Sequence, residues 1–361
     1  MNYKTIITYS LIMFLFSSLS AQSDSETRSF YRTIPVGKES SLEVSNKYGT
    51  IHVTPWNKDS ASIRAEVIAY ASNKSKLNKM FDGITINITD TKYVIRAHTE
   101  FTQNISMLFE SFKGITSKLI SYDSRVEINY YINAPDYLNL NIENKYGDVY
   151  MESNTGNFSL SVSNGSFKAN SLGEGSLITL AFCDATINSL ISGKINASFS
   201  EMSIGKTKDI SINSTSSKYN IRDAGIIRLE SRRDKYYIDN IEKLEGSSYF
   251  TDFNVSSLKK KLDLTTKYGS INADLIEKDF EAININSGYS DISLEFDPGS
   301  SYNFDIRHIN AFVVLPDKDT KTEKKALNED KKEYMTYGTV GKNPGSVKVK
   351  IDATRGNIYI K

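Results

Sequence analysis

The chain has 361 residues, with 44 basic and 43 acidic side chains and a formal net charge of +1. This balance argues against a general surface for nucleic acid or anionic membranes. Because Cys183 is the only cysteine, intramolecular disulfides are excluded and stability has to come from packing.

Residues 1–21 have the features of a secretory signal peptide. Lys4 supplies a positive charge, an apolar run follows from Ile6 to Leu19, and Ala21 is a small residue at the expected cleavage point. The run is shorter than a membrane-spanning helix, with an uncleaved anchor helix as the alternative. We therefore expect an exported protein, in the periplasm, at the cell surface or outside the cell, with no membrane span after cleavage.

Residues 22–137 are predicted to hold a first coil of the repeat described below and an N-terminal cap. Residues 22–32 are polar and predict a mobile lead-in, whereas Leu42, Val44 and Ile51 have the spacing of a coil. Alternating apolar residues in 62–68, 84–88, 94–96 and 126–132 then predict antiparallel strands. We expect this small sheet to cover the open N-terminal end of a stack.

An amphipathic helix is predicted within this cap. Apolar residues recur there at steps of three and four: Phe101, Ile105, Leu108, Phe112, Ile115 and Leu119. The stretch lacks the basic face of membrane-surface helices, so packing on the sheet is favoured over binding to a membrane or partner.

Residues 138–296 carry a repeat with a period near 17 residues. An alternating strand, a Tyr-Gly turn and a second short strand occupy Leu140 to Val149 and return at Leu262 to Ile271. The first apolar residue after each turn forms the series Val149, Phe167, Ile187, Ile204, Ile221, Ile238, Val255, Ile271 and Ile292. Self-similarity at a nearly fixed period indicates a stacked array.

The length of one repeat predicts the architecture. A coil of about 17 residues holds two short strands and two turns, which is too little to bury a core alone. We therefore predict an all-β chain built as a β-solenoid or flattened β-helix, in which Ile204, Ile221 and Ile238 stack on one another. An antiparallel sandwich is the alternative.

Three aromatic residues are the candidate ligand platform. Tyr219, Tyr236 and Phe253 take the position that Gly147 and Gly269 hold just before the apolar residue of other coils. In a stack these rings would lie about 4.8 Å apart, which permits stacking. They predict either an outward platform for sugar rings or a ladder that holds the coils in register, and the ladder is favoured.

Residues 297–361 are predicted to finish the stack. Asp297-Pro298-Gly299 breaks the repeat, and the highly charged segment 317–333 predicts a solvated loop or short helix. Val347, Val349, Ile351 and Ile358 restore the coil spacing, so the final strand is expected to close the C-terminal edge.

The recurrent turns carry a family resemblance. Lys-Tyr-Gly-x-Ile/Val sequences surround Tyr48, Tyr146 and Tyr268, and the chain closes with Arg355-Gly-Asn-Ile-Tyr-Ile360. In these motifs the chain resembles the bacterial "putative adhesin" family of secreted β-strand-repeat proteins, a domain of unknown function. The resemblance implies a β-solenoid-like fold and a location in the cell envelope, and it supplies no catalytic residues.

The sequence contains no recognisable catalytic or metal motif. The histidines His52, His98 and His308 match no metal spacing, and no phosphate loop or nucleophile elbow is present. Carboxylates that gather near the turns are Asp148, Asp184, Glu201, Asp223, Asp234, Asp252 and Asp291, where Asp commonly bonds the local backbone. We expect no cofactor, no metal and no catalytic residue.

Two classes of function follow. The favoured prediction is a non-enzymatic, adhesin-like binding or scaffold module, whose partner is a surface glycan or an envelope protein. The alternative is a carbohydrate-active β-helix enzyme such as a polysaccharide lyase. The residues nearest to a lyase site are Lys218, Arg232, Arg233, Asp234 and Lys235.

Overall fold

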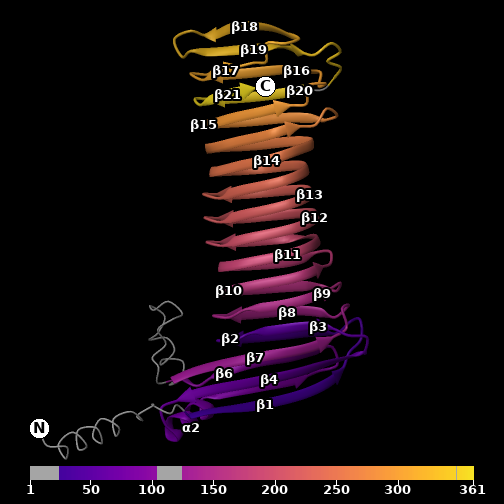
Figure 1. Cartoon of the computed structure of the whole chain (residues 1–361), viewed down its shortest axis with the longest axis vertical. Helices are drawn as coiled ribbons and strands as arrows, with labels where there is room; N and C mark the ends of the chain where they lie inside the picture. Colours follow the sequence, from indigo (N-terminus) through magenta and orange to yellow (C-terminus); the bar gives the residue numbers. More distant parts are fainter. Residues whose placement is uncertain (1–23, 104–123, 347) are drawn as a thin grey trace, which may run out of the picture.

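The computed structural model describes residues 24–103, 124–346 and 348–361. The described chain is all-β, and its parallel and antiparallel strands are hydrogen-bonded into one mixed sheet. The helix α2 (Lys74–Asp82) lies beside this sheet. Figure 1 shows the strands stacked along one long axis, with the N-terminal segments at one end. The predicted signal peptide and most of the predicted helix, Ile105 to Leu119, lie outside the described residues, while Phe101 ends strand β6 (Val94–Phe101).

Parallel strands form the centre of the stack. They are β8 (Asn139–Lys145), β9 (Val149–Asn154), β10 (Phe158–Leu172), β11 (Ser176–Ser198), β12 (Glu201–Thr215), β13 (Lys218–Arg232), β14 (Lys235–Ile276) and β15 (Ala282–Phe296). β8 and β9 both pair with β10, and from β10 to β15 each strand pairs with the next along the chain. Successive segments therefore add to the stack in chain order from β8 to β15 (Figure 1).

The core is a set of columns made by equivalent residues of successive coils. Ile221 pairs with Ile204 on one side and Ile238 on the other, and all three are at most 2% exposed, so their predicted stacking is confirmed. The predicted alignment is wrong at two steps. Phe167 pairs with Ala185 and not with Ile187. Ile271 lies beside Phe253 and not beside Val255, because Ser270 bonds to Asp252 and Asn272 to Asn254. The inward-facing residues are still predicted correctly, because a shift of two residues along a strand keeps the same side chains on the same face.

Further strands extend the stack at its N-terminal end. β2 (Ser41–Lys47) and β3 (Ile51–Pro55) form the coil beside β8 and β9. β6 and β7 (Ser124–Ala134) lie parallel to β2 and β3, and β5 (Ile84–Asp90) and β4 (Ser60–Ala71) add antiparallel partners. The predicted antiparallel pairs are therefore present, together with parallel pairs that the alternation could not reveal.

The first described strand corrects the expectation for residues 22–32. From Asp24 onward the chain is not a mobile lead-in but the strand β1 (Asp24–Pro35), which pairs antiparallel with β4 along its whole length. Its side chains are almost all exposed, which explains its polar composition. The backbone ladder to β4 holds it, and composition carries no signal of such a ladder.

The C-terminal segments are stacked out of chain order. β20 (Lys348–Thr354) lies between β15 and β16 (Tyr302–Ile309), and β21 (Asn357–Ile360) lies between β15 and β17 (Phe312–Val314). The final strand was expected to close the C-terminal edge of the stack. It is instead inserted inside the stack, so this expectation is wrong. Its apolar pattern fits this place, because Val349, Ile351 and Ile358 are fully buried.

The charged segment 317–333 is neither a loop nor a helix over most of its length. Residues Thr320–Asn328 form β18, which pairs antiparallel with β19 (Glu333–Val340). β18 has no second partner strand among the described residues, and its side chains are nearly all exposed. Charged side chains are a common protection for such an edge, because they oppose pairing with another chain.

We therefore expect loss of charge on β18 to promote self-association. Replacing Lys321 and Lys325 by valine leaves a flat, β-prone edge, and size-exclusion chromatography should show dimers or larger species as concentration rises. The matched control is Lys206→Val with Lys350→Val, on strands β12 and β20, whose two edges are already paired. Equal behaviour of the two double variants would contradict an edge effect.

Candidate functional site

The predicted platform lies inside the stack. Tyr219, Tyr236 and Phe253 each have 0% exposure, and their ring centroids are 4.7 and 5.2 Å apart in stacked geometry. An outward platform on these rings is therefore wrong, because no ring face is open to a ligand. The favoured interpretation, a ladder linking successive coils, agrees with their stacking. Burial also raises the pKa of the Tyr236 phenol well above its ordinary value.

A polar ladder runs beside this core. Ser200, Ser217, Asp234 and Thr251 are buried at steps of 17 residues. In each case the side-chain oxygen accepts a hydrogen bond from a backbone N–H one coil earlier, at 3.1 Å from Cys183, 3.3 Å from Ser200, 2.7 Å from Ser217 and 3.3 Å from Asp234. These bonds satisfy donors that a bend in the chain would otherwise leave buried and unpaired.

Asp234 is the centre of this ladder. It is 1% exposed, and its Oδ2 accepts hydrogen bonds from Ser214 Oγ and Ser231 Oγ, both at 2.6 Å, and from the N–H of Arg232 at 3.2 Å. Its Oδ1 accepts from the N–H of Ser217. A carboxylate so surrounded by fixed donors fits a structural role.

The residues nearest to a lyase site do not converge. Asp234 is buried, whereas Arg232, Arg233 and Lys235 are exposed on the outside of the chain. Lys218 Nζ pairs with Glu201 at 2.8 Å. Cys183 is also buried, and burial raises the pKa of its thiol, which makes it less reactive.

The most unusual exposed feature is a column of residues with positive φ. One such residue occurs at the same bend of each coil, with φ between 47° and 66°. We call this set the corner column, and its members in stack order are Tyr48, Tyr146, Asn164, Phe182, Phe199, Ser216, Arg233, Phe250, Tyr268, Tyr289, Arg355 and Asn310.

Backbone hydrogen bonds establish the order of the column. The N–H of Tyr146 donates to the carbonyl of Ser163 at 2.9 Å, just before Asn164, and the N–H of Ser216 donates to Arg232 at 2.9 Å, just before Arg233. Each member therefore sits directly beside the next coil's member. Asp234 and its ladder lie immediately behind this bend.

Aromatic residues are poorly suited to this backbone conformation. A non-glycine residue in the left-handed region costs about 1–2 kcal/mol, and only Gly, Asn and Asp enter it readily. Asn164 and Asn310 are the easy solution, yet seven members of the column are Tyr or Phe. Repeated strain of this kind points to a use for the side chains themselves.

The rings of the column stack on one another and remain accessible. Centroids are 4.9 Å apart for Phe182 and Phe199, 4.8 Å for Phe250 and Tyr268, and 5.1 Å for Tyr268 and Tyr289. Phe182 is 58% exposed, Phe199 55% and Phe250 46%. An exposed apolar strip of this kind is typical of an interaction surface.

Cations accompany the rings. The guanidinium of Arg355 lies 5.0 Å from the ring centroid of Tyr289, and its Nη1 donates to the Tyr289 hydroxyl at 3.2 Å. Lys267 Nζ lies 5.3 Å from the ring of Tyr268. The column therefore offers apolar edges and positive charge together.

The aromatic sequence of the column breaks at two adjacent coils. Ser216 and Arg233 stand between Phe199 and Phe250, and we call these four residues the interruption. Arg232 and Arg233 are both exposed, and no carboxylate of the described residues lies within ion-pair distance of either guanidinium. This is the point of the column where a ring face and free positive charge adjoin.

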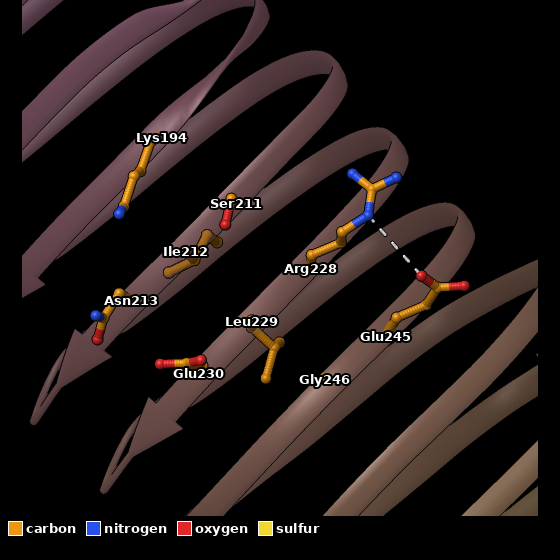
Figure 2. Close-up of a pocket in the computed structure, with 9 residues that line it drawn as sticks. All are labelled: Lys194, Ser211, Ile212, Asn213, Arg228, Leu229, Glu230, Glu245 and Gly246. Carbon is orange, nitrogen blue, oxygen red and sulfur yellow. Dashed lines mark ion pairs between the residues drawn. The ribbon is translucent and has the colours of Figure 1, made fainter.

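A groove lies on the strands that lead to Ser216 and Arg233. It has a volume of about 310 Å³ and is lined by Lys194, Ser211, Ile212, Asn213, Arg228, Leu229, Glu230, Glu245 and Gly246. Figure 2 shows Asn213 and Glu230 close to the arrowheads that end β12 and β13, three residues before Ser216 and Arg233. Arg228 is held by Asp209 at 2.6 Å and faces Glu245 at 3.9 Å (Figure 2).

Sequence reasoning found part of this site. The Lys-Tyr-Gly turns contain Tyr48, Tyr146 and Tyr268, but the prediction was built on the glycine and on the first apolar residue after it. Phe182, Phe199 and Phe250 lack a following glycine and were missed. The available signal was an aromatic residue three positions before the first inward residue of the second strand, as Phe182, Phe199 and Phe250 stand before Ala185, Met202 and Phe253.

Two further searches define what the described part of the chain holds. No group of three or more His, Cys, Asp or Glu residues there is arranged to hold a metal ion. Within the same residues, none of the helices has the length and apolar character needed to cross a membrane.

No protein-family model matches the chain, and no curated protein sequence matches it. Among solved structures, a "putative cell adhesion protein" from Clostridium sporogenes is 11% identical, with a TM-score of 0.23, over 93% of this chain and 100% of its own. A "putative lipid binding protein" from Parabacteroides distasonis is 13% identical, with a TM-score of 0.35, over 74% and 96%. A "putative adhesin" from Parabacteroides merdae is 11% identical, with a TM-score of 0.31, over 75% and 90%.

The corner rings are expected to add little to stability. Phe182→Gly removes a left-handed penalty of about 1–2 kcal/mol but also loses a stacking contact of about 0.5–1.5 kcal/mol. The free energy of unfolding, measured with urea, should therefore change by no more than about 1 kcal/mol. Phe182→Asn, which also tolerates positive φ, should behave in the same way. A loss above about 3 kcal/mol in both variants would show that the column is a structural pillar.

Proposed function

We propose that this chain is an exported, non-enzymatic, adhesin-like module: a β-solenoid rod that binds a surface glycan or envelope protein through its corner column. The observation that carries the proposal is the run of exposed aromatic residues in a strained backbone conformation at successive coils. In this proposal residues 1–21 direct export, 22–137 and 297–361 flank the stack, and 138–296 supply its coils.

Two physical arguments support a binding role. The strain at seven aromatic positions is a recurring cost, and stacking between exposed rings offsets only part of it. The column also continues along the same edge of successive coils, which suits an elongated partner better than a small ligand. Stacked coils hold such side chains on a rigid backbone, which lowers the entropic cost of binding.

The proposal can be tested by stripping the rings from the column. Phe182, Phe199, Phe250 and Tyr289 are each replaced by Asn, which tolerates positive φ, and both proteins are applied to arrays of surface glycans and to envelope extracts of the producing cells. We expect the parent chain to bind and the stripped variant to lose binding while its melting temperature stays the same.

An exposed position away from the column provides the matched control for specificity. A conservative change at an exposed position away from the column, Lys350→Thr on β20, should leave binding intact. Binding that survives removal of the corner rings would contradict the proposal, as would turnover of any bound glycan into shorter products.

A further inference from the structure

We propose that the interruption of the corner column, Phe199–Ser216–Arg233–Phe250, is the principal subsite of this surface, and that it takes a uronic-acid unit of an acidic polysaccharide. The inference rests on the binding role proposed above and names its ligand class. Four observations carry it: an uncovered ring face, a small residue beside it, unpaired guanidinium groups and the adjoining polar groove.

The first observation is the uncovered face of Phe199. Its ring lies nearly parallel to that of Phe182, at an interplanar angle of 2°, so one of its two faces is covered. The other face is turned toward the next coil, where the corner residue is Ser216. On the far side, Phe250 stacks on Tyr268 at 4.8 Å and is the next ring of the column.

The second observation is the space that Ser216 leaves. Neighbouring coils are about 4.8 Å apart, so Phe199 and Arg233 stand roughly 10 Å apart with only a hydroxymethyl side chain between them. One flat ring, with its apolar face on Phe199 and its opposite face toward the guanidinium, matches that interval. A pyranose has such faces, because its axial C–H groups present an apolar surface to an aromatic ring.

The third observation is the sign of the local charge. Arg232 and Arg233 are exposed and have no carboxylate partner among the described residues, whereas most other arginines of the stack are paired. Every charged residue of the corner column or immediately before one of its members is basic: Lys47, Lys145, Arg232, Arg233, Lys267 and Arg355. A guanidinium binds a carboxylate through two parallel hydrogen bonds, so an acidic sugar gains more here than a neutral one.

The fourth observation is the groove next to these two coils. Its exposed Lys194, Ser211, Asn213 and Glu230 present donors and acceptors, and the apolar Ile212 and Leu229 of its lining are buried. This lining suits the hydroxyl groups of neighbouring sugar units in a chain that crosses the corner. A peptide partner could not add a strand here, because the strands are already paired on both sides. Its backbone N–H and C=O groups would therefore lack hydrogen-bond partners.

The test uses purified protein and a panel of defined oligosaccharides: oligogalacturonate, oligomannuronate and oligoguluronate, each with its methyl-esterified form. Titration calorimetry should detect binding of at least one acidic oligomer and a loss of about tenfold or more in affinity for its ester. Arg233→Gln should lower the affinity for the acidic oligomer by a similar factor and leave the affinity for the ester unchanged. Phe199→Asn should weaken both forms, with unchanged melting temperatures.

The matched control is Arg222→Gln, which removes an arginine on the same coil that is paired with Asp223 at 3.3 Å and lies away from the corner. It should bind like the parent chain. Equal affinity for acid and ester would overturn the acidic ligand, and binding insensitive to Arg233→Gln and Phe199→Asn would overturn the subsite. If no oligosaccharide of the panel binds, while the ring-stripped variant still loses the binding that the parent chain shows on glycan arrays or envelope extracts, this inference is overturned and the binding role stands.

Discussion

Tyr236→Ala is expected to lower the free energy of unfolding by about 3–5 kcal/mol, the usual cost of deleting a large aromatic side chain from a core. Tyr236 is fully buried, and its ring is held between Tyr219 at 4.7 Å and Phe253 at 5.2 Å. The change opens a cavity between two coils and also removes the contact of its hydroxyl with Ser214 Oγ at 3.1 Å. Chemical denaturation followed by circular dichroism measures the loss.

Tyr237→Ala is the matched control, because Tyr237 is the next residue on the same strand and points outward with 41% exposure. Its removal should cost no more than about 1 kcal/mol. A larger loss for Tyr237→Ala than for Tyr236→Ala would show that the inward and outward faces of β14 are assigned the wrong way round.

Asp234→Ala should destabilise the protein by roughly 3 kcal/mol or more. The carboxylate accepts hydrogen bonds from two serine hydroxyls and from the N–H groups of Ser217 and Arg232, and all of this lies in the interior. Alanine leaves the two N–H donors buried without an acceptor, and each such group carries a penalty of about 1–3 kcal/mol.

The prediction is sharpened by two comparisons measured in the same denaturation experiment. Asp234→Asn keeps one acceptor oxygen but turns amide hydrogens toward existing donors, so it should fall between the parent and Asp234→Ala. Asp239→Ala removes an exposed carboxylate from the adjoining outer face and should change stability by about 0.5 kcal/mol or less. An Asp234→Ala variant as stable as the parent would mean that its hydrogen bonds contribute little.

The sequence predicted the parts of the fold that follow periodicity. The inward positions of Ile204, Ile221 and Ile238 came from alternation and a 17-residue step, and both signals survive small errors of alignment. The all-β class has the same origin. The stacking of Tyr219, Tyr236 and Phe253 also followed from their spacing, although their direction did not.

The bends of the coil could not be located from the pattern alone. The chain turns at Phe199, Ser216 and Arg233, which have no common chemistry, because the turn is held by side chains from the next coil. Glycine marks this bend only where it follows the corner residue, as at Gly147 and Gly269. The sequence pattern therefore gives the corner residues no role, and it places the turn at Tyr219, Tyr236 and Phe253, which lie in the interior.

Composition also misled the assignments at both ends. β1 and β18 are polar strands that each pair with one neighbour and turn almost all their side chains to the outside, so neither has an apolar rhythm. The order in which β15, β20 and β16 are stacked is likewise invisible locally, since each has the same pattern of buried residues.

The placement of β20 and β21 has a consequence for how the protein is made. Residues 348–360 are synthesised after residues 302–314, yet they lie between those residues and β15. Until residues 348–360 are available, β16 and β17 lack the strands that join them to the rest of the stack, and the β18–β19 hairpin is attached to β16 alone. Coil-by-coil growth can therefore proceed only as far as β15. Beyond that point β16–β21 must assemble together as a single late event, with an unpaired end presented to chaperones or to other chains until then.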